Sequence, residues 1–319
     1  MNGRSEVLCA GIVVADHVCA PIDHVPAEGE LVLTGAMLLT IGGCAANAAV
    51  ALRKMGVSAA VVGRVGEDAF GATVKQLLDR EKVDTSLLLT SHGQPTSQTM
   101  IINVMGEDRR FIHIFGANAA FTAADIPFDR IRHCKVLYLG GYLLMPGMRQ
   151  NELVPLFKAA QAAGVKTVLD VGVPGQADYL HRLDQLLPYV DVFLPNNDEA
   201  AIILNDPDPV QQAIAFHRMG AKNTVVTLGG DGAILVNQEG RYRAGVYPVD
   251  YIDGSGSGDA FDAGFICGLL RGLPPVECLK LASALGASCV RGLGTTTSIF
   301  DESECADFQT KHALKIEKI

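Results

Sequence analysis

The residues most able to do chemistry lie in one glycine-rich stretch, from Asp253 to Asp259 (Asp-Gly-Ser-Gly-Ser-Gly-Asp). This stretch runs directly into the helical pattern of residues 261–270, so its backbone N–H groups are expected at the positive end of a helix dipole, where a phosphate or an oxyanion binds. A bound phosphate would repel an acid at this position, so the presence of Asp259 needs an explanation. Asp259 can act as a base that takes the proton of a hydroxyl attacking a phosphoryl group. The simpler alternative is a flexible turn in which Asp259 only caps the helix.

Two further polar groups stand where a ligand could reach them. Gly42-Gly43 opens a second helical pattern with Asn47 in its first turns. An amide there can bind sugar hydroxyls, although close packing of a helix start explains the glycines equally well. Asn196 and Glu199 follow the predicted strand 190–194, at the strand end where open α/β sheets bind ligands, and could order phosphates and the water molecules of Mg²⁺. Helix capping alone explains that pair equally well.

The common nucleotide-binding motifs are absent or incomplete. The sequence has no Gly-x-x-x-x-Gly-Lys run, which a Walker loop requires. Gly254-x-Gly256 is followed by Asp259 where a dinucleotide fingerprint needs its third glycine, and the loop does not follow the first strand. Any phosphate site in this chain must therefore use another fold.

Composition excludes several classes of protein. The 319 residues carry 26 basic and 35 acidic side chains, a net charge of −9, with no cluster of Lys or Arg, which argues against nucleic acid as a partner. No apolar run reaches the roughly 18 residues that cross a bilayer, so we expect a globular protein with no membrane partner. The eight cysteines form no Cys-x-x-Cys pair, which predicts buried free thiols and a cytoplasmic protein. Asp16 and His17 interrupt the apolar start, which indicates a strand rather than a signal peptide.

Strand-like runs alternate with helical patterns, which predicts an α/β doubly wound fold: a mainly parallel sheet with helices on both faces. The predicted strands are 6–14, 59–63, 136–140, 166–171, 190–194, 224–228 and 233–236, and the predicted helices are 45–55, 69–82, 151–163, 209–219 and 261–270. Two segments, 12–40 and 96–117, break the alternation; the second holds strand-like stretches 99–104 and 109–115 joined by the turn 105–108. We expect residues 1–319 to form a single domain with these two segments as a small appended sheet.

Together these segments resemble the PfkB, or ribokinase-like, family of carbohydrate kinases, over essentially the whole chain and in the same order. The amino-terminal signature is matched by Gly42, Gly43, Asn47 and the run Gly63-x-Val65-Gly66-x-Asp68-x-Phe70-Gly71. The carboxyl-terminal signature is matched by residues 253–261. Two distant signatures are more specific than either alone. The resemblance implies a ribokinase-like fold, a β-sheet lid over the sugar, and ATP-dependent phosphorylation of a sugar hydroxyl.

The resemblance also implies a role for each matched residue. Asp259 is the implied catalytic base, and the anion hole is formed by the amides of Gly256, Ser257 and Gly258. Sugar hydroxyls are held by Asp16, Gly42, Gly43 and Asn47. ATP is contacted by Asn196, Thr227, Gly229 and Gly232, and Glu199 orders Mg²⁺ through water. Asp253 and Ser298 are implied ligands of a monovalent cation such as K⁺, although the loop 291–298 is one residue longer here.

The chain departs from the family pattern in two segments. Gly254 stands where Thr is usual and Ser257 where Ala is usual, which predicts a more mobile loop. The segment 170–174 (Asp-Val-Gly-Val-Pro) lacks the Arg that an acidic sugar or a sugar phosphate would need. We therefore expect a neutral sugar, and an acidic one would point to Arg109 or Arg110 on the lid. The alternatives are a nucleoside kinase and a catalytically silent ligand-binding relative, against which the intact Asp259 counts.

The lid predicts an assembly as well. Its strands carry apolar side chains in alternation at Met100, Ile102, Val104, Ile112 and Ile114. A sheet of so few strands leaves an edge or an apolar face exposed, and two lids packed together would cover it, as in many dimeric relatives. We expect a homodimer joined through the lid. The alternative is a monomer whose lid folds down on the core.

Overall fold

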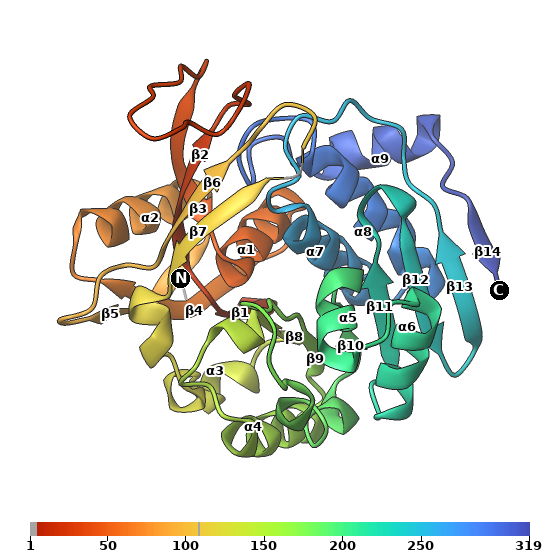
Figure 1. Cartoon of the computed structure of the whole chain (residues 1–319). Helices are drawn as coiled ribbons and strands as arrows, with labels where there is room; N and C mark the ends of the chain where they lie inside the picture. The colour runs from red at the N-terminus through yellow and green to blue at the C-terminus, as the bar shows by residue number, and fades with distance from the viewer. Residues whose placement is uncertain (1–4, 108) are drawn as a thin grey trace.

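The computed structural model describes residues 5–107 and 109–319, and in this part of the chain ten strands form one sheet (Figure 1). Seven are parallel neighbours, in the order β11 (Asn223–Thr227), β10 (Val192–Phe193), β9 (Lys166–Leu169), β8 (Val136–Gly140), β1 (Val7–Gly11), β4 (Ala59–Gly66) and β5 (Asp84–Ser91). An antiparallel edge follows β11, made of β12 (Ala233–Asn237), β13 (Gly240–Ala244) and β14 (Ile316–Lys318). The predicted mainly parallel sheet is confirmed.

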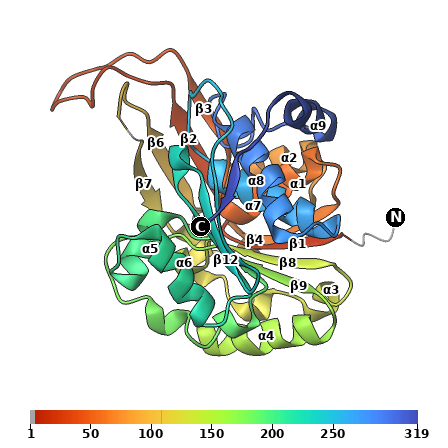
Figure 2. The same ribbon diagram turned by 90° about the vertical axis from the view of Figure 1, so that its right-hand side faces the viewer.

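Helices cover both faces of this sheet, as Figure 2 shows. One face carries α1 (Cys44–Lys54), α2 (Ala69–Arg80), α7 (Ser257–Leu270), α8 (Pro275–Cys289) and α9 (Glu302–Lys311). The other carries α3 (Phe128–Ile131), α4 (Gln150–Ala162), α5 (Asn197–Leu204) and α6 (Pro209–Arg218). Successive residues of β1 enter opposite cores: Val7 and Cys9 pack on the first face, Leu8 and Ala10 on the second. A strand buried on both faces reads as a continuous apolar run, which explains why the sequence revealed it.

The predicted first strand, residues 6–14, is wrong as one element. The chain leaves the main sheet after Gly11 and enters a second, four-stranded sheet in the order β3 (Met37–Gly42), β2 (Val14–Cys19), β6 (Gln98–Ile102) and β7 (Arg110–Ile114). This second sheet is the predicted appended sheet, and we call it the lid. Its strands β6 and β7 begin or end one or two residues from the predicted limits, and residue Asp108 of the predicted turn lies outside the described residues.

The two faces of the lid differ. Paired residues Asp16, Thr99 and His113 form a row across one face, which we call the inner face because Asp16 points from it toward Asp259. The other face carries exposed apolar side chains, namely Met37, Leu39, Met100, Ile112 and Ile114. Val104, expected in this apolar set, is buried, because it pairs with Ile22 from the long loop between β2 and β3.

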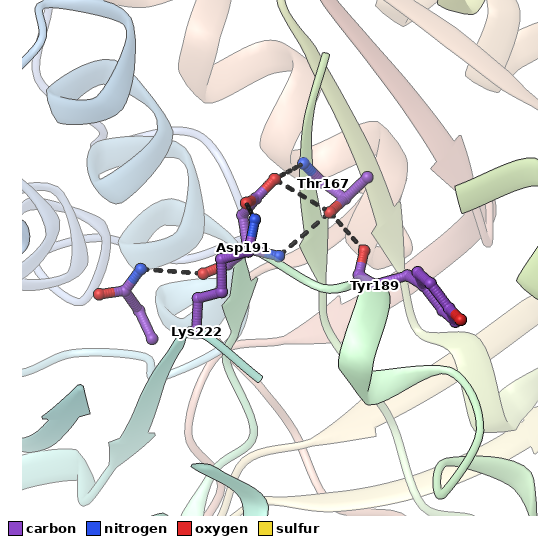
Figure 3. Close-up of polar contacts among 5 residues, drawn as sticks. Thr167, Tyr189, Asp191 and Lys222 are labelled. Atoms are coloured by element: carbon purple, nitrogen blue, oxygen red, sulfur yellow. Dashed lines mark hydrogen bonds and ion pairs between the residues drawn. The ribbon is translucent and has the colours of Figure 1, made fainter. Parts of the chain in front are cut away.

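A buried carboxylate joins the amino ends of β9, β10 and β11 (Figure 3). Asp191 accepts hydrogen bonds from the Thr167 amide (2.9 Å) and from Lys222 Nζ (2.7 Å). The Thr167 hydroxyl lies 3.2 Å from the same carboxylate and donates to the Tyr189 carbonyl at 2.7 Å. We call these residues the Asp191 network. Its polar atoms find partners on three neighbouring strands, so it fixes the sheet at the end opposite the carboxyl ends of the strands.

Two other expectations concern the whole chain. All eight cysteines are free thiols, as the sequence predicts, but only five are buried, because Cys19, Cys44 and Cys134 are partly exposed. Among the described residues, no helix combines the length and apolar character that spanning a membrane requires.

Candidate active site

Asp259 lies in the first turn of α7, and its carboxylate accepts a hydrogen bond from Asn47 Nδ2 at 2.8 Å. The two residues are 212 positions apart and belong to the two separate sequence signatures. The second amide atom, Asn47 Oδ1, is buried and has no hydrogen-bond partner in residues 5–107 and 109–319. A buried acceptor without a partner is costly, so this atom is suited to receive a hydrogen bond from a ligand hydroxyl.

Glycine is required where α7 begins. Gly256 has a left-handed φ of 77°, and a side chain there would also strike Thr295 of the following loop. Helix geometry leaves the N–H groups of Gly258 and Asp259 without an acceptor inside the helix, whereas the Ser257 N–H donates to the Gly254 carbonyl at 3.3 Å. A Cβ added at Gly258 would meet nothing within 4 Å, so the space beside this helix start is open. The loop can therefore cradle an anion mainly through Gly258 and Asp259.

Asp16 reaches this site from the inner face of the lid. Its carboxylate lies where a Cβ of Gly42 would stand, so Gly42 leaves room for Asp16. Gly43 has a φ of 89° and passes close to the carbonyl of Ile12. Burial raises the pKa of Asp16 to about 7; the hydroxyl of Thr99 opposes this, and the charges of Asp259 and Asp253 add to it.

Asp170, which sequence reasoning did not select, lies beside Asp259. One ligand atom each from Asp170, Asp259 and the Cys44 thiol lie within 4.8 Å of one another. Asp170 accepts a hydrogen bond from the Gly141 amide at 2.9 Å. Burial, followed by the charge of Asp259, raises the pKa of Asp170 to about 8, and burial also raises the pKa of Asp259. Asp170 directly follows β9, so the strand-end argument that selected Asn196 would have found it.

Asn196 and Glu199 form a reciprocal capping box at the start of α5. The Glu199 amide donates to Asn196 Oδ1 at 2.8 Å, and the Asn196 amide donates to Glu199 Oε2 at 2.9 Å. The capping alternative is therefore correct for their mutual contacts. Asn196 also pairs with Thr227, so two segments predicted to contact ATP lie side by side. Burial and then the charge of Asp170 raise the pKa of Glu199.

The predicted ATP segment continues as a tight turn after β11. The Leu228 amide donates to the Gly232 carbonyl at 2.8 Å, and Gly232 has a φ of 94° with no room for a side chain beside Ala244. Gly229 is exposed, and a Cβ there would meet nothing within 4 Å. The turn thus leaves open space next to Thr227.

These residues fit a magnesium nucleotide. Oxygen ligands from Asp170, Glu199 and Asp259 face one another closely enough for their charges to interact, and a hard divalent cation prefers such ligands, often through water. Glu199 and Asp170 would hold Mg²⁺, and the start of α7 would hold the phosphates.

The predicted monovalent cation site fits poorly. The two oxygens of buried Asp253 accept the amides of Ser255 and Gly294, each at 3.0 Å. Ser298 instead lines a separate pocket of about 450 Å³ that does not include Asp253. The Arg291 side chain donates to the Ser298 carbonyl at 3.3 Å, and its positive charge disfavours a cation there.

Gly254 has a neighbour that the sequence did not predict. A Cβ at Gly254 would overlap Nη1 of Arg109, the residue immediately before β7 of the lid. The space left by the missing side chain at Gly254 is therefore filled by a guanidinium group. Arg109 also opposes the effect of burial on Asp259, since its charge lowers the pKa of that carboxyl. The sequence placed Arg109 on the lid but not in the site, because its position depends on how the lid folds over α7.

A doubly wound sheet, a β-sheet lid and an acid beside a glycine-rich helix start together define a kinase that acts on small molecules. The chain belongs to the PfkB family of carbohydrate kinases, since the model described as "pfkB family carbohydrate kinase" matches residues 4–302.

Individual relatives agree over nearly the full length. The chain is 28% identical over 314 residues to the ribokinase of Haemophilus influenzae, covering 96% of this chain and 98% of that protein. It is 30% identical over 291 residues to an ATP-dependent ribose-1-phosphate kinase of Halopiger xanaduensis, covering 88% and 90%. The structure of Arabidopsis thaliana ribokinase complexed with ribose and ATP superposes with a TM-score of 0.78 at 24% identity, covering 96% and 99%. A putative ribokinase II from E. coli in complex with ATP and Mg²⁺ also gives 0.78, at 19% identity, covering 97% and 100%. At these identities the two structures establish the fold.

Proposed function

We propose that this carbohydrate kinase transfers the terminal phosphoryl group of ATP to a hydroxyl of a neutral sugar, within one domain covered by the lid segments 12–40 and 96–117. The observation that carries the proposal is the contact between Asn47 and Asp259, which joins the implied sugar residues to the implied base. Asp259 accepts the proton of the attacking hydroxyl, while Asn47 holds the carboxylate and offers its free oxygen to the sugar. The N–H groups that open α7 face the charge that develops on the phosphoryl group.

The acids around Asp259 support a neutral acceptor. Asp16 has a raised pKa of about 7, so near neutral pH its carboxyl is partly protonated. A protonated carboxyl both donates and accepts hydrogen bonds, which suits the hydroxyls of a sugar. An anionic sugar placed beside these acids would be repelled instead.

The co-substrate and cofactor follow from the same site. ATP would lie along Asn196, Thr227, Gly229 and Gly232. Mg²⁺ held by Glu199 and Asp170 would neutralise phosphate charge when bound. The two relatives solved with ATP support this assignment.

A nucleoside kinase is the second candidate, and one observation favours it. Phe111 belongs to the inner face of the lid and is 55% exposed, so its ring is available to stack on a base. Of the other phenylalanines near the lid, Phe121 is fully buried and cannot serve.

A panel of acceptors tests the proposal. ADP release is measured with neutral pentoses, hexoses and ketoses, with 2-keto-3-deoxy acids and sugar phosphates, and with nucleosides. We expect a neutral sugar to be preferred over acidic ones by about 10- to 100-fold in kcat/KM, the value of one missing charge-assisted pair. Preference for ribose 1-phosphate or another anion would contradict the proposed acceptor class, and preference for nucleosides would favour the second candidate.

We further propose a cytoplasmic homodimer joined through the outer lid face. The eight free thiols fit a reducing compartment. Met37, Leu39, Met100, Ile112 and Ile114 leave an apolar surface that a second lid would cover. Light scattering at micromolar concentration should give twice the 33.7 kDa chain mass. Ile112 is 63% exposed on the outer lid face, so the variant Ile112→Asp should be a monomer. A wild-type protein of 33.7 kDa would refute the dimer.

A further inference from the structure

The lid brings a guanidinium group to the loop that opens α7. The pairing of Ile102 with Arg110 fixes the beginning of β7, and Arg109 precedes it. The Arg109 guanidinium stands 5.6 Å from the centre of the Phe111 ring, on which a cation is stabilised. Its Nη1 atom fills the position that a side chain at Gly254 would take, and the Tyr251 hydroxyl lies 2.9 Å from that same position. Arg109 can therefore occupy this position only because residue 254 has no side chain.

The charge of Arg109 is needed in this part of the molecule. Asp16, Asp170, Asp259 and Glu199 all carry carboxyl groups into the site, and a triphosphate entering it would be repelled by those that are ionised. Arg109 acts on Asp259, whose pKa it lowers against the effect of burial. A guanidinium group is planar and presents paired N–H donors that match the oxygens of a phosphoryl group.

We propose that Arg109 completes the anion hole at the start of α7 and binds oxygens of the phosphoryl group during its transfer. This inference rests on the proposed function. In the step itself the acceptor oxygen bonds to the γ-phosphorus and its proton passes to Asp259. The bond between the γ-phosphorus and the β,γ-bridging oxygen breaks, and ADP leaves with that electron pair. Arg109 keeps its protons throughout and stabilises charge on the phosphoryl oxygens. The lid therefore takes part in catalysis as well as covering the sugar.

The neighbouring arginine provides a matched control. Arg110 belongs to the same lid strand and carries the same charge, but its side chain is exposed and pairs with Glu107. Replacing either residue removes one positive charge from the lid. Replacing Arg109 alone removes the charge that lies against Gly254.

Steady-state kinetics of the two variants form the first test. Arg109→Ala should lower kcat by about 10²- to 10³-fold, the usual effect of removing one donor to a developing oxyanion, with little change in KM for the sugar. Arg110→Ala should stay within about twofold of the wild type. Equal effects of the two variants would overturn the proposal. So would an Arg109→Ala defect confined to KM of the sugar, because Arg109 would then bind the acceptor.

A conservative variant covers the case in which Arg109→Ala does not fold. Arg109→Lys keeps the charge but loses the planar pair of donors, so kcat should fall by about tenfold or more while the melting temperature stays that of the wild type. Guanidinium ion added at millimolar concentration should restore part of the activity of Arg109→Ala and none of that of Asp259→Asn. Full activity of Arg109→Lys would overturn the paired-donor role.

A double-mutant cycle tests the link to Gly254. Gly254→Thr places a side chain where Nη1 of Arg109 lies, so it should displace the guanidinium and lower kcat by a similar factor. In the Arg109→Ala background only the Tyr251 hydroxyl, at the end of an exposed side chain, remains close to that position, and Gly254→Thr should cost less than about threefold. Full additivity of the two effects would overturn the link.

A binding measurement separates this inference from the proposed function. If the wild type phosphorylates no acceptor on the panel, the proposed function fails, but calorimetry with Mg²⁺ and tripolyphosphate still tests Arg109. Arg109→Ala should weaken tripolyphosphate binding by about tenfold or more relative to Arg110→Ala. Equal affinities of the two variants for tripolyphosphate would overturn the role of Arg109, whatever the acceptor panel shows.

Discussion

The two ends of strands β9 and β10 hold buried carboxylates in opposite circumstances. At the amino end, Asp191 is 5% exposed and accepts hydrogen bonds from the Thr167 amide and Lys222. At the carboxyl end, Asp170 is 8% exposed, accepts hydrogen bonds from the Gly141 and Val171 amides and the Cys44 thiol, and faces the acids Asp259 and Glu199. The residue type and the degree of burial are nearly the same, so the neighbours make the difference.

This difference shows which end of the strands is organised for stability and which is not. The Asp191 network gives its carboxylate one partner of opposite charge, Lys222, together with the neutral donors of Thr167, and it connects three strands. The acids at the other end repel one another and stay partly protonated, a state that a fold selected for stability alone would avoid. Their positions suit a ligand that supplies a cation or hydrogen-bond donors to these carboxyl groups.

The largest effect is expected from the base. Asp259→Asn should lower kcat by about 10²- to 10⁴-fold, because the amide cannot accept the hydroxyl proton, while the melting temperature stays equal or rises because a buried charge is lost. ADP release and a thermal melt at pH 7.5 measure both quantities. The control is Asp307→Asn on the exposed side of α9, which removes the same charge far from the site. Turnover of Asp259→Asn near the wild-type value would remove Asp259 from the mechanism.

The opposite pattern is expected from the Asp191 network. Asp191→Ala leaves the buried Thr167 amide without an acceptor, so the free energy of unfolding should fall by about 1–3 kcal/mol while kcat/KM stays unchanged. Urea denaturation and the ADP-release assay measure the two. Lys222→Met should cost only about 0–1 kcal/mol, because the lysine side chain is 57% exposed. A drop in kcat for Asp191→Ala at unchanged stability would mean that the two ends are coupled.

The smallest effect concerns pH. Folding raises the pKa of Asp16 to about 7 and that of Asp170 to about 8, so the folded protein holds protons that the unfolded chain has released. The free energy of unfolding should therefore fall as pH rises from about 4 to about 8. Asp170→Asn still accepts the Gly141 amide but cannot ionise, so its free energy of unfolding should exceed that of the wild type at pH 8, and by much less at pH 4. Urea denaturation at both pH values tests this, and an equal gain at both would show that charge is not the cause.

Much of the fold could be predicted because the parallel strands are buried on both faces. The strand Val136–Gly140 is predicted with its observed limits, since a buried run shows in the sequence. Strands β13 and β14 were not predicted, because their largely exposed residues carry no apolar pattern. The antiparallel orientation of β12 was missed too, since it depends on the short turn into β13.

The site divides in the same way. Glycines and acids with a fixed spacing, such as those between Asp253 and Asp259, could be selected from the sequence, and the structure brings Asp259 to Asn47. Arg109 could not be placed, because its contact with Gly254 requires the folded lid. The row formed by Asp16, Thr99 and His113 likewise exists only once β2 pairs with β6 and β6 with β7.

The position of β1 inside the sheet, between β4 and β8, has a consequence for how the chain is made. Val7 pairs with Ala59 on one side and with Val136 on the other, so β1 has to wait until β8 is synthesised before its second edge is covered. Pairings this distant in sequence form slowly. A nascent chain that ends before residue 136 presents an open apolar strand edge, which is a template for aggregation. We therefore expect a nascent chain of about 130 residues to aggregate unless a chaperone covers this edge.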